Sequence, residues 1–280
     1  MKRGIALGGG GARGAYEMGA LKALKEMGYL DRLDAISGVS VGSLNAAFLA
    51  HDNIEEGEKL WLSEEIDTIF SKPPSFIKKV FDKESSLLDD GLYETKKLEA
   101  LIDRMIDYDA MRKANVRVGI SYVGDEDTGF FELLRANVGY LFDNKAYLRY
   151  VDLTNLSDKD IKSTILASCA IPVVFQPVII DGKKYFDGGM FERLPCTPLV
   201  EMGMDEIIAI DLFRLNLWRK KQRENSTIIH IRPSRGLGRI MDFSPEKNRL
   251  RFATGYEDAF KAMREYEEEK KEKQADASGK

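Results

Sequence analysis

Ser40 lies at the centre of a G-x-S-x-G motif, residues 38–42, which has the residue types and spacing of a serine nucleophile. Gly38 and Gly42 allow a tight, strained turn between a strand and a helix, and this turn pushes the serine side chain into a cleft. The start of the following helix carries partial positive charge, which stabilises a developing alkoxide. The motif therefore predicts that Ser40 attacks an electrophilic carbon.

A run of glycines precedes this motif, and residues 8–14 read G-G-G-G-A-R-G. Its G-x-G-x-x-G spacing is also found in dinucleotide-binding proteins, which expect an acidic residue about 20 positions further on, at the end of the second strand. Here the second predicted strand ends in the Ser40 turn instead. We therefore favour an oxyanion hole, in which glycines let backbone N–H groups converge on an acyl oxyanion. Nucleotide binding is the alternative.

The base for Ser40 is not an obvious histidine, because the chain has only two. His51 would lie roughly 16 Å from Ser40 along a helix that rises about 1.5 Å per residue, too far to reach it. His230 belongs to an apolar predicted strand, residues 228–231, where a buried core histidine is expected. The order Ser40, Asp187, His230 nevertheless matches the chain order of an α/β-hydrolase triad, so a triad is an alternative.

Asp187 is the preferred base. It ends a predicted hairpin, and Gly188 and Gly189 follow it, which exposes the carboxylate and permits close backbone approach. An aspartate is a weak base, with an ordinary pKa of about 3.9. It suits this task if water is excluded and Ser40 donates to it directly. A plain Asp-Gly-Gly turn is the alternative.

The predicted elements around these motifs alternate between strand and helix. Strands over residues 5–7 and 34–37 each lead through a glycine-containing turn into a helix, over 15–24 and 43–50. This order predicts a parallel sheet with right-handed crossovers. Further predictions are helices over 54–70 and 98–106, a short amphipathic piece over 75–83, a strand pair over 116–123 and 129–134, a helix capped by Ser157, a hairpin over 175–186, and strands over 206–211 and 227–231.

Composition narrows the class of protein. The chain has 280 residues and a net charge of −4, which is unlike a general nucleic-acid-binding protein. Cys169 and Cys196 form no metal-binding pattern and suggest a reducing compartment. No apolar stretch approaches the ~20 residues that span a bilayer, and no signal peptide is recognisable. We expect a cytoplasmic enzyme without metal or organic cofactor.

The motifs together resemble the patatin-like phospholipases. The glycine–arginine loop, the G-x-S-x-G turn and the D-G-G of residues 187–189 occur in the order and at the spacing of that family. Residues 167–177, with the pattern A-S-x-x-x-P-x-x-F-x-P, and residues 255–259, G-Y-E-D-A, are also similar to it. The resemblance covers nearly the whole chain up to the charged tail. In one departure, this chain has Glu192 and Arg193 where family members often carry asparagines.

The resemblance implies a three-layer α/β/α sandwich with a mainly parallel central sheet. It implies a Ser–Asp dyad in which Ser40 is the nucleophile and Asp187 is first the base and then the acid for the leaving alcohol. It further implies an oxyanion hole shaped by Gly9, Gly10, Gly11 and Arg13, with Gly14, Gly38, Gly42, Gly188 and Gly189 as motif positions. For Arg13, a solvated side chain in the first helical turn is the alternative. The activity that follows is hydrolysis of carboxylic esters of phospholipids or acylglycerols.

Residues 5–200 are expected to form the core, 201–264 to complete the same domain, and 265–280 to be a charged, disordered tail. Residues 76–81 and 212–221 mix aromatic and basic side chains that suit peripheral contact with the inner face of a membrane, or packing on the core. The alternatives in function are a weakly active regulatory or scaffolding protein, and an esterase or thioesterase with a soluble acyl substrate. Protein partners and oligomeric state are not indicated.

Overall fold

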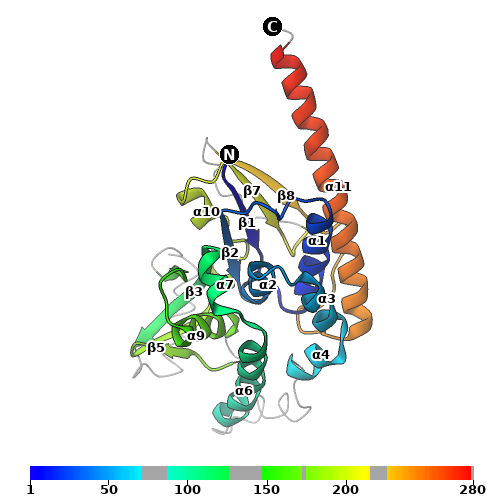
Figure 1. Ribbon diagram of the computed structural model, residues 1–280. Coiled ribbons are helices and arrows are strands. Elements are labelled where there is room, and N and C mark those ends of the chain that lie inside the picture. The colour runs from blue at the N-terminus through cyan, green and yellow to red at the C-terminus, as the bar shows by residue number, and fades with distance from the viewer. Residues whose placement is uncertain (71–86, 126–146, 172–174, 215–225, 279–280) are drawn as a thin grey trace.

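The protein is built on one mixed eight-stranded sheet (Figure 1). The computed structural model describes residues 1–70, 87–125, 147–171, 175–214 and 226–278. The strands are β1 (Arg3–Leu7), β2 (Ala35–Val39), β3 (Val116–Asp125), β4 (Leu148–Asp152), β5 (Val178–Ile180), β6 (Lys183–Asp187), β7 (Glu206–Ile210) and β8 (Thr227–Ile231). Their order is β5-β6-β3-β2-β1-β7-β8, and β4 also pairs with β3.

The helices follow the strands closely in the chain. They are α1 (Gly14–Glu26), α2 (Val41–Ala50), α3 (Ile54–Leu62), α4 (Glu64–Phe70), α6 (Leu87–Met105), α7 (Tyr108–Lys113), α9 (Asp158–Cys169), α10 (Thr197–Glu201) and α11 (Pro245–Ser278), with short 3-10 turns η1 (Gly11–Arg13) and η2 (Gly188–Met190). Ser157 caps α9, and its side chain accepts a hydrogen bond from the amide of Asp160, as predicted.

The sheet has a parallel half and an antiparallel half. The strands β3, β2, β1, β7 and β8 pair in parallel, whereas β4, β5 and β6 run antiparallel to their neighbours. This arrangement confirms the α/β fold with a mainly parallel sheet. It also brings the ends of β2 and β6 to either side of β3, where the two catalytic candidates lie.

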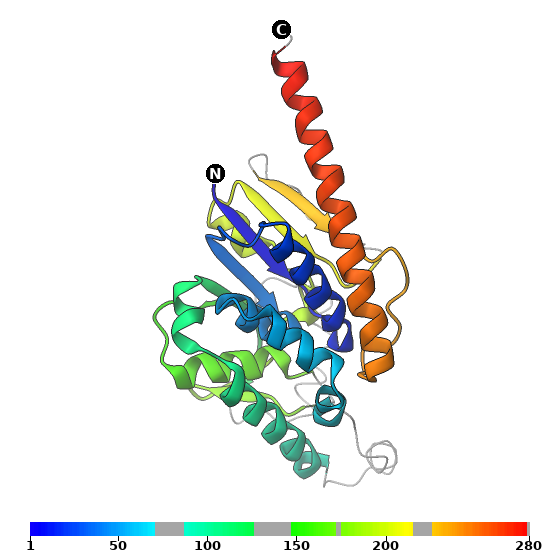
Figure 2. The same cartoon turned by 45° about the vertical axis from the view of Figure 1, so that its right-hand side comes forward.

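Because successive side chains of a strand point to opposite faces of the sheet, the apolar residues form two clusters, one on each face. In β1, Ile5 and Leu7 belong to the large cluster and Ala6 to the small one, and neighbouring strands alternate in the same way. Helices α1, α2, α9 and α11 cover the first face (Figure 2). Among the described residues, α10 and its flanking segment cover the other face with a thinner layer that includes Leu199 and Met204.

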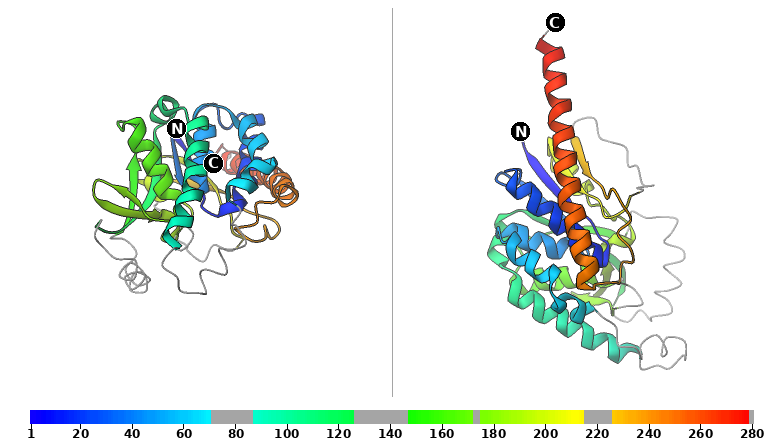
Figure 3. Two further views of the ribbon diagram at one scale, coloured as in Figure 1. Left: turned by 90° about the horizontal axis from the view of Figure 1, so that it is seen from below. Right: turned by 90° about the vertical axis from the view of Figure 1, so that its right-hand side faces the viewer.

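The last helix differs from the expectation of a disordered tail after residue 264. Helix α11 continues to Ser278 and extends past the body of the protein (Figure 3). Between Pro245 and Ser278 its sequence contains no proline, and ion pairs four residues apart join Lys261 to Glu265 and Glu269 to Lys273. A run of good helix formers with such pairs favours a solvated helix.

Some predicted segments cannot be compared with the structure. The amphipathic piece 75–83, the strand 129–134 and most of the segment 212–221 lie outside the described residues. Strand β4 was not predicted. The helix predicted over 54–70 is two helices, α3 and α4, because the backbone is extended at Ser63.

Candidate active site

Ser40 occupies the turn between β2 and α2 with a strained backbone. Its φ is 55° and its ψ is −131°, a conformation that side chains with a Cβ rarely adopt. The flanking glycines are required by close contacts, because a Cβ at Gly42 would lie 2.3 Å from the carbonyl oxygen of Leu7. A Cβ at Gly38 would lie 2.7 Å from the carbonyl oxygen of Gly42. The turn therefore has the geometry that the G-x-S-x-G motif predicts.

Polar groups of α9 and α2 hold the backbone of Ser40. The hydroxyl of Ser168 accepts a hydrogen bond from the Ser40 amide at 2.8 Å and donates to the carbonyl of Gly119 at 2.7 Å. The carbonyl of Ser40 accepts from the hydroxyl of Ser43 at 2.6 Å and from the thiol of Cys169 at 3.4 Å. Burial raises the pKa of that thiol, so Cys169 stays protonated and acts as a donor.

Asp187 is placed by the end of β6. Its carbonyl accepts from the hydroxyl of Ser121 at 2.6 Å, and its amide donates to the carbonyl of Ala170 at 3.0 Å. The carboxylate oxygen Oδ1 accepts from the amide of Gly189 at 2.7 Å. A Cβ at Gly188 would lie 2.6 Å from the carbonyl carbon of Gly119, so the two glycines let the loop fold back against β3.

The structure places Ser40 and Asp187 beside each other. The side chain of Ser40 interacts with the carboxylate of Asp187 and lowers its pKa. Both residues are buried, with 3% and 6% of their surfaces exposed. Burial raises the pKa of Asp187 to about 6, although the interactions with Ser40 and Gly189 oppose this shift. A carboxylate with that pKa is ionised at neutral pH and is a stronger base than an ordinary aspartate.

The glycine loop lies against this pair. A Cβ at Gly9 would be 3.2 Å from the Cβ of Ser40, and the Gly9 amide donates to the carbonyl of Arg193 at 2.8 Å. The Gly9 amide is thus already occupied. Within the part of the chain that the structure describes, the amides of Gly10 and Gly11 have no hydrogen-bond acceptor. These two amides are therefore the available donors of the loop.

Arg13 supports the loop through its side chain. Its guanidinium donates to the carbonyl of Gly238 at 2.8 and 3.2 Å and to the carbonyl of Leu212 at 3.1 Å. Its amide donates to the carbonyl of Gly10 at 3.2 Å. The N–H groups of the guanidinium thus bind backbone carbonyls and hold the segments at Leu212 and Gly238 beside the glycine loop. Gly14 begins α1, and a Cβ there would meet the ring of Trp61 at 2.4 Å.

A buried glutamate that the sequence motifs do not indicate also supports the glycine loop. Glu17 is fully buried in α1 and accepts from the amide of Gly8 at 2.6 Å and from the side-chain amide of Asn45 at 2.8 Å. Asn45 also donates to the carbonyl of Gly14 and accepts from the indole of Trp61. Burial raises the pKa of Glu17 to about 8. This network joins the glycine loop to the helix that follows Ser40.

Neither histidine can serve Ser40. His51 is at the far end of α2. His230 belongs to β8, which is separated from β2 by β1 and β7, about 14 Å across the sheet at ordinary strand spacing. It is exposed on this edge strand, which corrects the expectation of a buried core residue. Partial burial and Arg232 lower its pKa to about 4. The His230 triad is therefore wrong on geometry.

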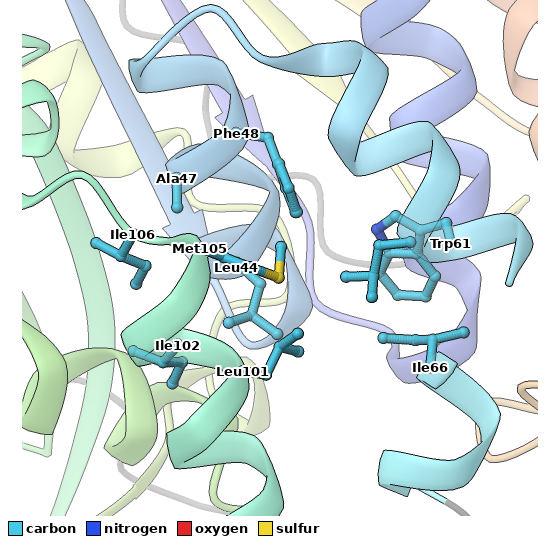
Figure 4. A pocket seen from close by; sticks show the side chains of 10 residues that line it. Leu44, Ala47, Phe48, Trp61, Ile66, Leu101, Ile102, Met105 and Ile106 are labelled. Carbon is cyan, nitrogen blue, oxygen red and sulfur yellow. The ribbon is translucent and has the colours of Figure 1, made fainter. Parts of the chain in front are cut away.

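An apolar pocket begins one helical turn after Ser40. Leu44 and Phe48 of α2, Trp61 of α3, and Leu101 and Met105 of α6 are among the side chains that line it. Figure 4 shows Leu44, Leu101 and Met105 gathered between α2 and α6, with Trp61 facing Ile66 on the other side. The lining has no charged side chain, and the cavity between these residues measures only about 10 Å³.

The loop after Asp187 contains the two residues that depart from the family pattern. Glu192 accepts a hydrogen bond from the hydroxyl of Thr197 at 2.8 Å, which ties the loop to the start of α10. Arg193 uses its carbonyl to hold the Gly9 amide. Glu192 and Arg193, which differ from the family pattern, therefore both anchor this loop.

The described residues contain neither a membrane-spanning helix nor a cluster of metal ligands. No helix among them is long and apolar enough to cross a membrane. In the same ranges, no group of three or more histidine, cysteine, aspartate or glutamate side chains is arranged to hold a metal ion.

The protein has a strained serine at a strand-to-helix turn, beside a buried carboxylate on a mixed sheet. This fold and site are typical of the α/β proteins with a nucleophile elbow. The family profile described as patatin-like phospholipase matches residues 5–200. The chain belongs to the patatin-like phospholipase family.

Named relatives agree with this assignment. The chain is 30% identical over 220 residues to neuropathy target esterase sws of Drosophila melanogaster, a match that covers 75% of this chain and 13% of the relative. It is 25% identical over 217 residues to lysophospholipase NTE1 of Kluyveromyces lactis, covering 75% and 12%. An uncharacterized NTE family protein of Mycobacterium bovis is 27% identical over 208 residues, covering 74% and 48%. The chain therefore spans less than half of each of these relatives.

The fold has a counterpart among solved structures. VipD from Legionella pneumophila superimposes with a TM-score of 0.53 and 17% sequence identity, over 94% of this chain and 67% of that one. At that level of identity the likeness concerns the fold alone.

Proposed function

We propose that this protein is a serine lipid acyl hydrolase that cleaves carboxylic esters of phospholipids or acylglycerols through an acyl-Ser40 intermediate. The observation that carries the proposal is the interaction of the strained, buried Ser40 with the buried carboxylate of Asp187. The family of the chain, and the words esterase and lysophospholipase in the names of two relatives, support an ester substrate with an acyl chain.

In the proposed mechanism Asp187 takes the proton from the hydroxyl of Ser40 while the serine oxygen attacks the ester carbonyl carbon. The carbonyl oxygen becomes an oxyanion, which the free amides of Gly10 and Gly11 and the positive end of α2 stabilise. Asp187 then gives its proton to the departing alcohol. Water hydrolyses the acyl-serine by the same steps in reverse, with Asp187 as base.

The apolar pocket supports an acyl substrate. Its lining begins at Leu44, one turn along α2 from the nucleophile, and its cavity of about 10 Å³ must widen before an acyl chain enters. Each methylene then buried there contributes about 0.8 kcal/mol. We propose that part of the acyl chain lies against this lining. A larger neutral side chain at Leu44, such as Leu44→Phe, is then expected to shift the preference toward shorter chains.

The proposal includes action in the cytoplasm at the inner face of a membrane. Residues 212–214 of the aromatic and basic segment are described, with Phe213 half-buried and Arg214 exposed. Vesicle sedimentation of the protein and of Trp218→Ala tests this contact. Equal binding by the folded variant would contradict a role for the segment.

The decisive experiment compares ester hydrolysis and fluorophosphonate labelling in wild type, Ser40→Ala, Asp187→Asn and His230→Ala. The first variant should lose both signals, because the nucleophile is absent. Asp187→Asn should lose turnover, because an amide cannot take the proton. His230→Ala should retain activity. Full activity in Asp187→Asn would exclude the dyad, and retained activity in Ser40→Ala would exclude an acyl-Ser40 intermediate.

A further inference from the structure

Two arginines meet at one aromatic ring beside the candidate active site. The guanidinium carbon of Arg13 lies 4.4 Å from the centre of the Phe213 ring, and that of Arg193 lies 4.6 Å from the same centre. Burial lowers the pKa of Arg13, and the nearby positive charge of Arg193 lowers it further. Two like charges at one ring create a local positive potential that attracts an anion.

The two arginines have different roles. Arg13 is partly buried and donates to carbonyl groups of the chain, as described above. Arg193 is exposed, and no described residue forms a hydrogen bond or ion pair with its guanidinium. The nearby carboxylate of Asp211 is buried and accepts from the amide of Phe213 at 3.0 Å. Within the described ranges the donors of Arg193 are therefore unused, while Phe213 holds its side chain against the protein.

The backbone of Arg193 is connected to Ser40 through Gly9. Its carbonyl holds the amide of Gly9, and Gly9 packs against Ser40. In a glycerophospholipid the phosphate is separated from the acyl esters by only a few bonds of the glycerol. An arginine fork matches two phosphate oxygens with parallel hydrogen bonds, a geometry that neutral acylglycerols do not offer.

We propose that Arg193 binds the phosphate of a phospholipid substrate and makes the enzyme prefer phosphate-bearing esters to neutral acylglycerols. This inference rests on the proposed function and narrows its substrate class. Arg13 and Phe213 form the base of the site: the ring supports the Arg193 side chain, and the second cation strengthens the field.

The test uses a lysophospholipid and a monoacylglycerol with the same short acyl chain, both below their aggregation concentrations. The measured quantity is the ratio of kcat/KM for the two substrates. In Arg193→Gln this ratio should fall about tenfold, the size expected for one charge-assisted hydrogen bond. Arg193→Lys should recover part of the ratio. The matched control is Arg264→Gln, which removes an exposed arginine from α11 and should leave the ratio unchanged.

Binding measurements in a Ser40→Ala background separate this inference from the proposed function. Calorimetry there should show that Arg193→Gln weakens binding of the lysophospholipid more than that of the monoacylglycerol. Absence of ester hydrolysis in wild type would contradict the proposed function, while this binding comparison would still decide the role of Arg193. A change of equal size for both ligands would overturn the phosphate site, because it would indicate that Arg193 only supports the loop.

Inorganic phosphate distinguishes a head-group site from a site for the free ion. A phospholipid site is expected to show both the altered substrate ratio and weaker inhibition by phosphate in Arg193→Gln. Phosphate inhibition that depends on Arg193, together with an unchanged substrate ratio, would overturn the head-group assignment. An unchanged ratio without any inhibition would overturn the site altogether.

Discussion

The carboxylate of Glu17 accepts a hydrogen bond from the amide of Gly8 at 2.6 Å, directly beneath the glycine loop. Its other oxygen accepts from Asn45 on the helix that follows Ser40. No charged side chain contributes to the raised pKa of Glu17, which comes from burial alone. One acidic residue thus joins the two parts of the proposed site, and its proton should be measurable in the stability of the protein.

Glu17 is expected to make stability fall with rising pH between about 6 and 8. Its pKa is about 8 in the folded protein and 4.5 ordinarily, so the folded state holds a proton that the unfolded state has lost. Stability is then lost as pH rises through this window, with a slope of at most about 1.4 kcal/mol per pH unit. Denaturant titrations of wild type and Glu17→Gln at several pH values measure it. Glu17→Gln should remove the slope, and an unchanged slope would assign it to another group.

Asp187 is expected to control the pH dependence of catalysis. The base must be ionised, and its pKa is about 6, so the rate of fluorophosphonate labelling should be constant above that value and fall below it, by about tenfold per pH unit. His230→Ala is the control, because the pKa of His230 is about 4 and its loss should not move the inflection. A labelling rate that is flat between pH 8 and 5 would contradict Asp187 as base.

Gly9→Ala should reduce activity with little effect on folding. The added Cβ would press on Ser40 at 3.2 Å and on Val39 at 3.3 Å, so the serine must move by a few tenths of an ångström from its position beside Asp187. Gly236→Ala is a matched control, since nothing lies within 4 Å of the Cβ position there. Labelling rates and thermal unfolding of both variants test this expectation. Equal labelling by the two variants would show that the loop tolerates the methyl group.

Ser168→Ala should destabilise the turn that holds the nucleophile. The substitution leaves the buried amide of Ser40 and the carbonyl of Gly119 without a side-chain partner, at a cost of about 1–3 kcal/mol. Ser163→Ala, on the same helix but less buried, is the control. Urea unfolding gives the free energies of both variants. A loss no larger than that of the control would mean that the Ser168 hydroxyl does not stabilise the turn.

The sequence was sufficient to predict the features that depend on local rules. The turn at Ser40, the end of the hairpin at Asp187 and the strand–turn–helix alternation all follow from short-range spacing, and the structure has them. Predicting that Ser40 and Asp187 lie close together required the family resemblance as well, because β3 lies between β2 and β6 in the sheet.

The supporting residues depend on contacts between distant segments and were not predicted. In the sequence Glu17 resembles an ordinary charged position of a helix, because its partners Gly8 and Asn45 belong to other segments. Ser168 was noted in a family-like stretch without a role, and its partner Ser40 is 128 positions away in the chain. The family resemblance predicts that Arg13 shapes the oxyanion hole. In the structure its guanidinium donates to the backbone carbonyls of Leu212 and Gly238, which are about 200 positions away in the chain. Sequence spacing carries no information about such pairs.

The crossing of α1 and α11 has a consequence for the folding unit. A Cβ at Gly19 would lie 2.0 Å from the carbonyl oxygen of Phe252, and one at Gly255 would lie 1.9 Å from that of Tyr16, so the two helix backbones touch. The family match ends at residue 200, before β7, β8 and α11. A fragment cut there would leave β1 as an unpaired sheet edge and α1 bare on the face that α11 covers. The boundary of the recognisable motif is therefore not the boundary of the smallest piece that could fold, and expression trials should extend at least through the helix crossing.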